Sequence, residues 1–408
     1  MKKKKRSTSL GRLSKELHPP YYSSSIPIMT MRMRMMMKGP QLLSTIALLS
    51  AVRPHHRSSS LLASAFFTSR VSHHHTIRMM ASSTTTTTSN INQTQILQDA
   101  LYRIRDVNHV PPHIRESLIP FCVDGRVVGQ VTPAKAQVLV DCPPAVFELV
   151  TESSSSTSSS SSSNPILTLS SHCGSTPDER TAAVAQVTDQ LRQQGLIPGW
   201  RNELFPVAAS FDEAPLFLME RAAVPSLGVL EYGIHINGIV QATNNDTTHT
   251  QMWMARRSLT KSKHPGMLDQ MVAGGQPAGL SLLENCRKEC AEEAGIPPHL
   301  THRIVPAGAI SYEQYIPSSD TLSRVVLFNF DLPLPADFIP TPVDGEVEEF
   351  FLWTVPELLQ SLSPDFPDPL KPNCYVVVID WLVRQGHLSP DTPGYLDVLR
   401  ELRSGDCQ

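Results

Sequence analysis

The sequence predicts an α/β protein whose folded part follows a long N-terminal extension. A capped helix over 281–295 lies between segments that alternate apolar and polar residues as strands do. An almost acid-free stretch rich in Ser, Thr and Met precedes the first amphipathic pattern. These observations divide the chain into an extension, a small α+β region and an α/β region.

The N-terminal extension, residues 1–94, has the composition of an organellar transit peptide. By position 97 the chain has carried fourteen Lys and Arg and a single acid, Glu16, which amounts to +13. Such a segment is expected to be disordered and to direct the protein to a plastid or mitochondrion. The alternative is an upstream extension of the reading frame, with a cytoplasmic product that starts at an internal methionine: Met29, Met79 or Met80.

The rest of the chain is acidic and has few features of a nucleic-acid or membrane protein. It carries −16, because the whole chain carries −3. An acidic body argues against nucleic-acid partners, whose phosphates select basic faces. The one long apolar patch of the extension, 42–52, is too short to span a bilayer. The seven cysteines contain no C-x-x-C pair, which argues against a zinc ribbon or a disulfide framework.

Residues 95–226 are expected to form a small α+β accessory domain. An amphipathic pattern predicts a helix over 96–106, and Asp124-Gly125 suits the turn of a hairpin over 121–128. Strands are expected at 146–150 and 166–169, joined by a disordered serine-rich loop over 151–164, and a capped helix should run from Thr176 to Gln194. No acid/base pair or ligand spacing here supports catalysis of its own.

Residues 227–388 are expected to form the α/β domain, and 389–408 a C-terminal tail. Alternation predicts strands over 227–240, 251–257, 325–330 and 346–353. Asn373 is expected to cap a helix that reaches Gln385 and buries Val377, Val378, Trp381 and Leu382.

The capped helix begins and ends with strong local signals. Ser281 and Glu284 form an S-x-x-E capping box, and Gly295 suits the left-handed residue that ends a helix. The apolar stripe between them, which should pack on a sheet, comprises Leu283, Cys286, Cys290 and Ala294.

Three carboxylates converge on a neighbouring face of this helix. Glu289, Glu292 and Glu293 lie at i, i+3 and i+4, where like charges repel unless a cation lies among them. Hard oxygen ligands of this kind suit Mg²⁺ or Mn²⁺. Gly274 and Gly275, in the turn before the helix, allow a metal-bound diphosphate to approach the backbone. The alternative is a solvated acidic helix face after an ordinary turn.

The stretch 274–296, called the box below, resembles the Nudix hydrolase signature, in which a glycine, five residues, a glutamate and seven residues precede R-E-U-x-E-E-x-G-U, with U aliphatic. Gly274 matches the first glycine, and the segment from Lys288 to Ile296 matches the end of the pattern. Leu280 stands in place of the first glutamate and Lys288 in place of the arginine. Lysine lacks the arginine's fork, which in the family helps to hold the catalytic glutamate.

The wider text of residues 265–296 resembles the thiamine pyrophosphokinase-related branch of the family, and the likeness extends over about 96–388. It implies a Nudix α/β/α sandwich preceded by an accessory domain, and hydrolysis of thiamine diphosphate or its oxidised analogues to monophosphates. Glu289, Glu292 and Glu293 would be metal ligands, with Glu289 either a third ligand or the base that activates water. The alternatives are a nucleotide-type Nudix pyrophosphatase, acting for instance on an oxidised nucleoside triphosphate, and a non-catalytic ligand sensor.

Further contacts to a small-molecule diphosphate are expected outside the helix. Arg256 and Lys263 precede the glycine turn and are candidates for its phosphates, although a solvated hairpin tip explains them equally well. One of Glu346, Glu348 and Glu349 would supply a distal carboxylate of the kind that many Nudix enzymes use. His235 is either a substrate contact or a structural residue. Glu284, one turn before Lys288, is expected to pair with it.

Overall fold

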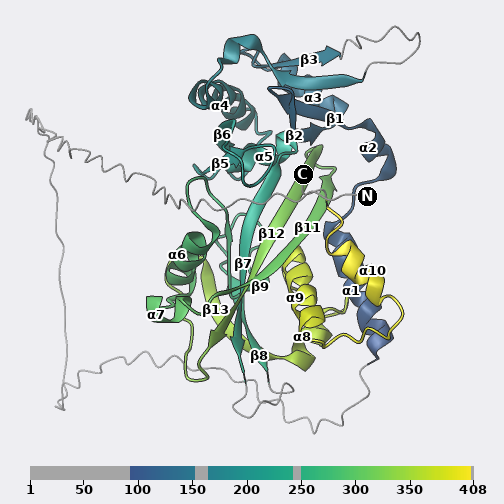
Figure 1. Cartoon of the computed structure of the whole chain (residues 1–408), viewed down its shortest axis with the longest axis vertical. Helices are drawn as coiled ribbons and strands as arrows, with labels where there is room; N and C mark the ends of the chain where they lie inside the picture. Colours follow the sequence, from purple (N-terminus) through teal and green to yellow (C-terminus); the bar gives the residue numbers. More distant parts are fainter. Residues whose placement is uncertain (1–91, 152–163, 242–249, 406–408) are drawn as a thin grey trace, which may run out of the picture. The chain divides into compact units, whose positions relative to one another are not determined.

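The computed structural model describes residues 92–151, 164–241 and 250–405 (Figure 1). The expected extension and the serine-rich loop fall almost entirely on 1–91 and 152–163, outside the described residues. Within the described ranges, no helix is long and apolar enough to cross a membrane.

The accessory part of the chain is built around a four-stranded sheet. Its strands have the order β2 (Arg126–Val131), β1 (Ile119–Val123), β4 (Pro165–Leu169), β3 (Phe147–Thr151). A second, two-stranded sheet pairs β5 (Leu204–Val207) with β6 (Phe217–Glu220). The helices of this part are α2 (Pro112–Ser117), α3 (Pro133–Asp141), α4 (Pro177–Gln193) and α5 (Val224–Leu227), with short 3₁₀ turns η1 (Ser171–Cys173) and η2 (Arg221–Ala223).

Local signals explain the elements of this part. Asp124 and Gly125 both have positive φ, 52° and 74°, which confirms the expected turn between β1 and β2. Thr176 and Glu179 form a complete capping box at the start of α4. A buried apolar cluster that includes Phe121, Phe147 and Phe217 joins the two sheets and α4. The expected α+β fold is therefore confirmed.

The second part is a seven-stranded mixed sheet. Its main path runs β11 (Val305–Ile316), β12 (Thr321–Leu334), β7 (Leu230–Val240), β8 (Gln251–Arg257), β13 (Val347–Thr354). Strand β10 (Val272–Gly275) pairs with β7, and β9 (Leu268–Gln270) pairs with β8. Strands β7 and β12 run parallel to each other. Strand β12 is longer than expected because its hairpin with β11 continues beyond 325 to Thr321.

Helix α6 (Leu282–Ala294) covers one face of this sheet, and α7 (Pro298–Thr301) follows it. The capping box and the left-handed Gly295 are present as expected. Cys286, Cys290 and Ala294 are fully buried against the sheet, whereas Leu283, expected in the same stripe, is 37% exposed. Leu282 packs there instead, because 282, 286, 290 and 294 form a single i, i+4 row.

The opposite face carries α9 (Pro372–Arg384), α8 (Val355–Ser361), α1 (Gln93–Val107) and α10 (Tyr395–Glu401) (Figure 1). Helices on both faces confirm the α/β/α sandwich. Asn373 does not cap α9: the helix begins at Pro372 and Lys371 is the N-cap, without a side-chain bond. The expected C-terminal tail contains α10, whose Val398 packs with α1 in the sandwich core.

Helix α1 belongs to the sandwich core although it precedes the accessory elements in the chain. Its apolar face, including Leu97 and Ile104, joins the same cluster as Trp381 of α9. The sequence predicts the amphipathic helix, but periodicity does not specify which element covers its apolar face. Hydrogen bonds also join the accessory sheet to the sandwich: Gln130 N donates to Gly228 O, and Thr132 Oγ1 to Asp320 Oδ2.

Candidate active site

A cleft of about 710 Å³ opens beside the box, and its walls come from both parts of the chain. Glu289, Glu292 and Glu293 of α6 line it, together with Gly274 and Gly275 of β10. The cleft extends over the face of the sheet opposite to α6, where β7 and β12 contribute side chains. The structure therefore brings the three box carboxylates into one concave site.

Glu293 is the most buried of the three carboxylates. Its residue is 6% exposed, and Oε2 accepts a hydrogen bond of 3.1 Å from Ala273 N. Burial raises its pKa well above the usual value, while the Ala273 bond acts in the opposite direction. Among the described residues no cation forms an ion pair with Glu293. An unpaired buried carboxylate is costly, so this position favours a bound cation.

Glu289 and Glu292 share Lys288. The lysine Nζ lies 3.2 Å from Glu289 Oε1 and 2.7 Å from Glu292 Oε2. Burial raises the pKa of Glu289, and Lys288 lowers it. The expected pairing of Lys288 with Glu284 is wrong, because the Glu284 carboxylate is bound to Ser281 in the capping box. Lys288 thus contacts two of the box carboxylates directly.

The two glycines of β10 make room for different neighbours on opposite faces of the strand. A Cβ on Gly274 would lie 2.8 Å from the carboxyl carbon of Glu289. A Cβ on Gly275 would lie 2.7 Å from Cζ of both Arg221 and Phe205, which belong to the accessory part. Successive side chains of a strand point to opposite faces. The absence of side chains here lets α6 and the accessory part approach the strand together.

The basic residues before the glycine turn have different roles in the structure. Lys263 and Arg257 line the cleft, whereas Arg256 does not. The Arg256 guanidinium binds Asp368 through two nitrogens, at 3.0 and 2.7 Å, and also reaches Glu349. Alternation along β8 explains the difference, because neighbouring residues of a strand face opposite sides. Arg256 is therefore a structural ion-pair residue here, in contrast to its expected role.

Of the three acidic residues near the start of β13, Glu346 lines the cleft. It forms an ion pair with Lys261. Glu349 pairs with Arg256, and Glu348 accepts a hydrogen bond from Leu259 N. Glu346 is therefore the member of this group that lies in the cleft, a distinction that the charge pattern alone does not make.

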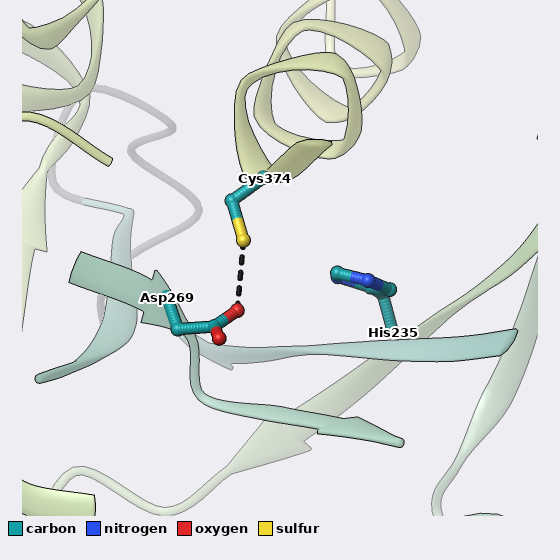
Figure 2. Close-up of side chains that lie close together, drawn as sticks. All are labelled: His235, Asp269 and Cys374. Atoms are coloured by element: carbon teal, nitrogen blue, oxygen red, sulfur yellow. Dashed lines mark hydrogen bonds between the residues drawn. The ribbon is translucent and has the colours of Figure 1, made fainter. Parts of the chain in front are cut away.

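A buried polar group forms where His235 of β7, Asp269 of β9 and Cys374 of α9 come together (Figure 2). Of these three residues, His235 lines the cleft. The Cys374 thiol donates to Asp269 Oδ1 at 2.7 Å. Asp269 also binds Arg257 at 2.5 Å and Lys371 at 3.1 Å. Burial raises the pKa of Asp269, but Lys371 and Arg257 outweigh it, so the net pKa lies below the usual value.

These ligand types can bind a metal, but the surroundings disfavour one. Two cations already neutralise Asp269, and burial raises the pKa of the Cys374 thiol well above its usual value. Burial also lowers the pKa of His235 to about 3, with Lys371 acting in the same direction. His235 is consequently neutral at physiological pH, and its Nδ1 has no hydrogen-bond partner in the described structure. The group supports the floor of the cleft.

Sequence reasoning missed Asp269, Lys371 and Cys374. Asp269 lies 102 residues before Lys371 and 105 before Cys374. It also missed the accessory residues that line the cleft: Arg201, Glu203, Phe205, Arg221 and Pro225. Their spacing carries no motif, since a β-hairpin and a 3₁₀ turn place them. The accessory part has no catalytic motif of its own, yet it forms one wall of the site.

Comparison with known proteins agrees with this arrangement. Residues 99–231 match the model of a domain of unknown function, DUF4743, and residues 237–374 match the NUDIX domain. Nudix hydrolase 24, chloroplastic, of Arabidopsis thaliana is 39% identical over 300 residues, covering 71% of this chain and 73% of that protein. Nudix hydrolase 20, chloroplastic, of the same plant is 39% identical over 292 residues, covering 71% and 74%.

An uncharacterized protein of Saccharomyces cerevisiae is 36% identical over 217 residues, covering 50% of this chain and 61% of its own length. The matches to the two plant proteins span both the accessory part and the sandwich, and the box glutamates lie together in a cleft of the NUDIX domain. The chain therefore belongs to the Nudix hydrolases, enzymes that act on phosphoanhydride bonds, and carries a DUF4743 domain before its NUDIX domain.

Proposed function

We propose that this Nudix hydrolase cleaves thiamine diphosphate or, preferably, its oxidised analogues to the monophosphates, with Mg²⁺ or Mn²⁺. The observation that carries the proposal is a cleft whose lining offers two kinds of group. The box carboxylates can hold a metal-bound diphosphate. Glu231 and Tyr312 offer an acidic and an aromatic group for the organic moiety.

The box carboxylates fit a divalent metal, which Nudix hydrolases typically use. Glu293 is buried without a cation partner among the described residues, and Lys288 is the single cation in contact with Glu289 and Glu292 there. Glu289, Glu292 and Glu293 would hold the ion through oxygen atoms, as hard cations prefer. A bound divalent ion supplies Lewis-acid stabilisation of phosphate charge and lowers the pKa of water. We assign Glu289 as ligand or base, and Lys263 as a phosphate contact.

The lining of the cleft also suits a heteroaromatic ring. Glu231, Tyr312 and Asn373 belong to this lining. A carboxylate accepts hydrogen bonds from an amino group, and an aromatic side chain packs against a flat ring. Thiamine and its oxidised analogues share an aminopyrimidine, so this lining favours the thiamine-related branch over a nucleotide substrate.

A substrate panel tests the proposal. Purified protein is incubated with thiamine diphosphate, oxothiamine diphosphate, 8-oxo-dGTP and ADP-ribose in saturating Mg²⁺ or Mn²⁺, and products are separated by chromatography. We expect the highest kcat/KM for a thiamine-type diphosphate, with inorganic phosphate as the second product. A preference for 8-oxo-dGTP would refute the substrate assignment and support the nucleotide alternative.

We also propose that the protein acts in a plastid. The supporting observations are the acid-poor composition of residues 1–97 and the chloroplastic designation of the two plant relatives. A fluorescent protein fused behind residues 1–94 should accumulate in plastids of transfected leaf cells. Fluorescence in the cytosol would contradict the proposal and favour translation from an internal methionine.

A further inference from the structure

The DUF4743 domain contacts strand β10 of the NUDIX domain through the cation Arg221. Arg221 follows strand β6 and begins the 3₁₀ turn η2, so the end of the β5-β6 hairpin places it at the cleft. Its guanidinium carbon would lie 2.7 Å from a Cβ on Gly275. A Cβ on the neighbouring Gly274 would lie 2.8 Å from the carboxyl carbon of Glu289. Arg221 and a box carboxylate therefore flank consecutive residues of β10.

Two contacts within the accessory domain orient Arg221. Its Nη1 donates to Glu203 Oε2 at 2.9 Å, and its Cζ lies 5.1 Å from the centre of the Phe205 ring. Phe205 is itself 3% exposed, so it provides a fixed platform. In the described part of the chain, Nη1 is the only guanidinium nitrogen of Arg221 with a hydrogen-bond partner. The side chain is 37% exposed, which leaves the remaining donors accessible from the cleft.

Three other cations of the cleft are more fully engaged. Arg257 binds Asp269 and also the carbonyl oxygens of Lys263 and His264. Lys371 is paired with the buried Asp269, and Lys261 with Glu346. Arg221 differs from these three because it presents unused donors in a fork, the geometry that matches two oxygens of a phosphate.

We infer that Arg221 binds a phosphate group of the substrate where it passes over Gly275, so that the DUF4743 domain completes the active site. This inference rests on the proposed function, because it requires that a diphosphate binds in the cleft. Glu203 and Phe205 are positioning residues: they hold the guanidinium against Gly275 of β10 and do not contact the substrate. Gly275 is required because any side chain there would displace Arg221 from the strand.

Ligand binding tests the inference without turnover. The probe is methylenediphosphonate, a diphosphate analogue that cannot be hydrolysed, titrated by calorimetry into the full chain with saturating Mg²⁺. We expect Arg221→Ala to raise its Kd at least about tenfold, the usual effect of losing a charge-assisted hydrogen bond. Arg221→Lys should give an intermediate Kd, because lysine keeps the charge and loses the fork.

Arg192→Ala is the matched control. Arg192 belongs to the same domain and also stacks on an aromatic ring, at 4.6 Å from the centre of Trp200, but it does not line the cleft. Its replacement should leave the Kd unchanged. If Arg221→Ala does not fold, as judged by thermal melting, Arg221→Gln retains the aliphatic stem on Phe205 and gives the deciding measurement.

The outcomes separate this inference from the proposed function. If no thiamine-type substrate is hydrolysed in the panel but Arg221→Ala binds the probe more weakly than the wild type, the proposed function is refuted and the inference about Arg221 is supported. Wild-type Kd in folded Arg221→Ala and Arg221→Gln would overturn the inference whatever the substrate. Absence of probe binding by the wild-type protein would also overturn it.

Discussion

Glu293→Gln should make the protein more stable and almost inactive at the same time. Glu293 is buried, accepts one backbone hydrogen bond from Ala273 and has no cation partner among the described residues. Each unit by which burial raises the pKa of a carboxyl group corresponds to about 1.4 kcal/mol of lost stability at neutral pH. Glutamine keeps an oxygen for the Ala273 bond and carries no charge. Without metal, we therefore expect a gain in unfolding free energy of at least about 1 kcal/mol.

The companion variant Glu292→Gln separates burial from catalysis. The Glu292 side chain is 50% exposed and pairs with Lys288, so its loss should change stability by at most about 1 kcal/mol. Both variants should lower turnover at least about a hundredfold, or about 2.7 kcal/mol, because each removes a proposed metal ligand. Added Mg²⁺ should also stabilise both variants less than it stabilises the wild-type protein.

Thermal melting in EDTA and in Mg²⁺, with turnover on the best substrate of the panel, measures all three effects. A gain of 1 kcal/mol shifts Tm by about 2 °C in a protein of this size. The reasoning is refuted if Glu293→Gln lowers Tm in EDTA, or if either variant retains more than a tenth of wild-type turnover.

Three further predictions follow from the same geometry. Lys288→Arg should retain turnover within about threefold, because arginine can still pair with Glu289 and Glu292; a tenfold loss would show that the lysine itself is required. Gly274→Ala should lower kcat at least about tenfold, since its Cβ would lie 2.8 Å from the Glu289 carboxyl carbon; unchanged kcat would contradict this close packing. His235 has a pKa of about 3 in the folded protein, below its unfolded value, so the unfolded chain takes up more protons as the pH falls from 7 to 5.5. Through His235, the wild type should lose on the order of 1 kcal/mol of unfolding free energy over this interval. The loss measured by urea unfolding should therefore be smaller in His235→Gln than in the wild type, by on the order of 1 kcal/mol. Equal losses in the two proteins would show that His235 is not buried in the neutral form.

Local chemistry determined the elements that the sequence predicts correctly. The cap of α6 depends on Ser281 and Glu284, three residues apart, and its end depends on Gly295. The convergence of Glu289, Glu292 and Glu293 follows from helical periodicity, which holds in any helix. The hairpin at Asp124-Gly125 likewise depends on two adjacent backbone conformations. These features require no knowledge of distant segments.

The tertiary structure decided which side chains meet across the fold. Alternation along β8 shows that Arg256 and Arg257 point to opposite faces, but it does not show which face borders the cleft. The pairing of β8 with β13 and β9 decides this, and it places Arg257 in the cleft. Asp269, Lys371 and Cys374 become neighbours because the chain at the start of α9 lies against β9, where Lys371 N donates to Leu268 O. Arg221 reaches Gly275 because the accessory domain docks on the sandwich. Such contacts depend on strand pairing and packing between distant segments, and residue spacing along the chain carries no record of either.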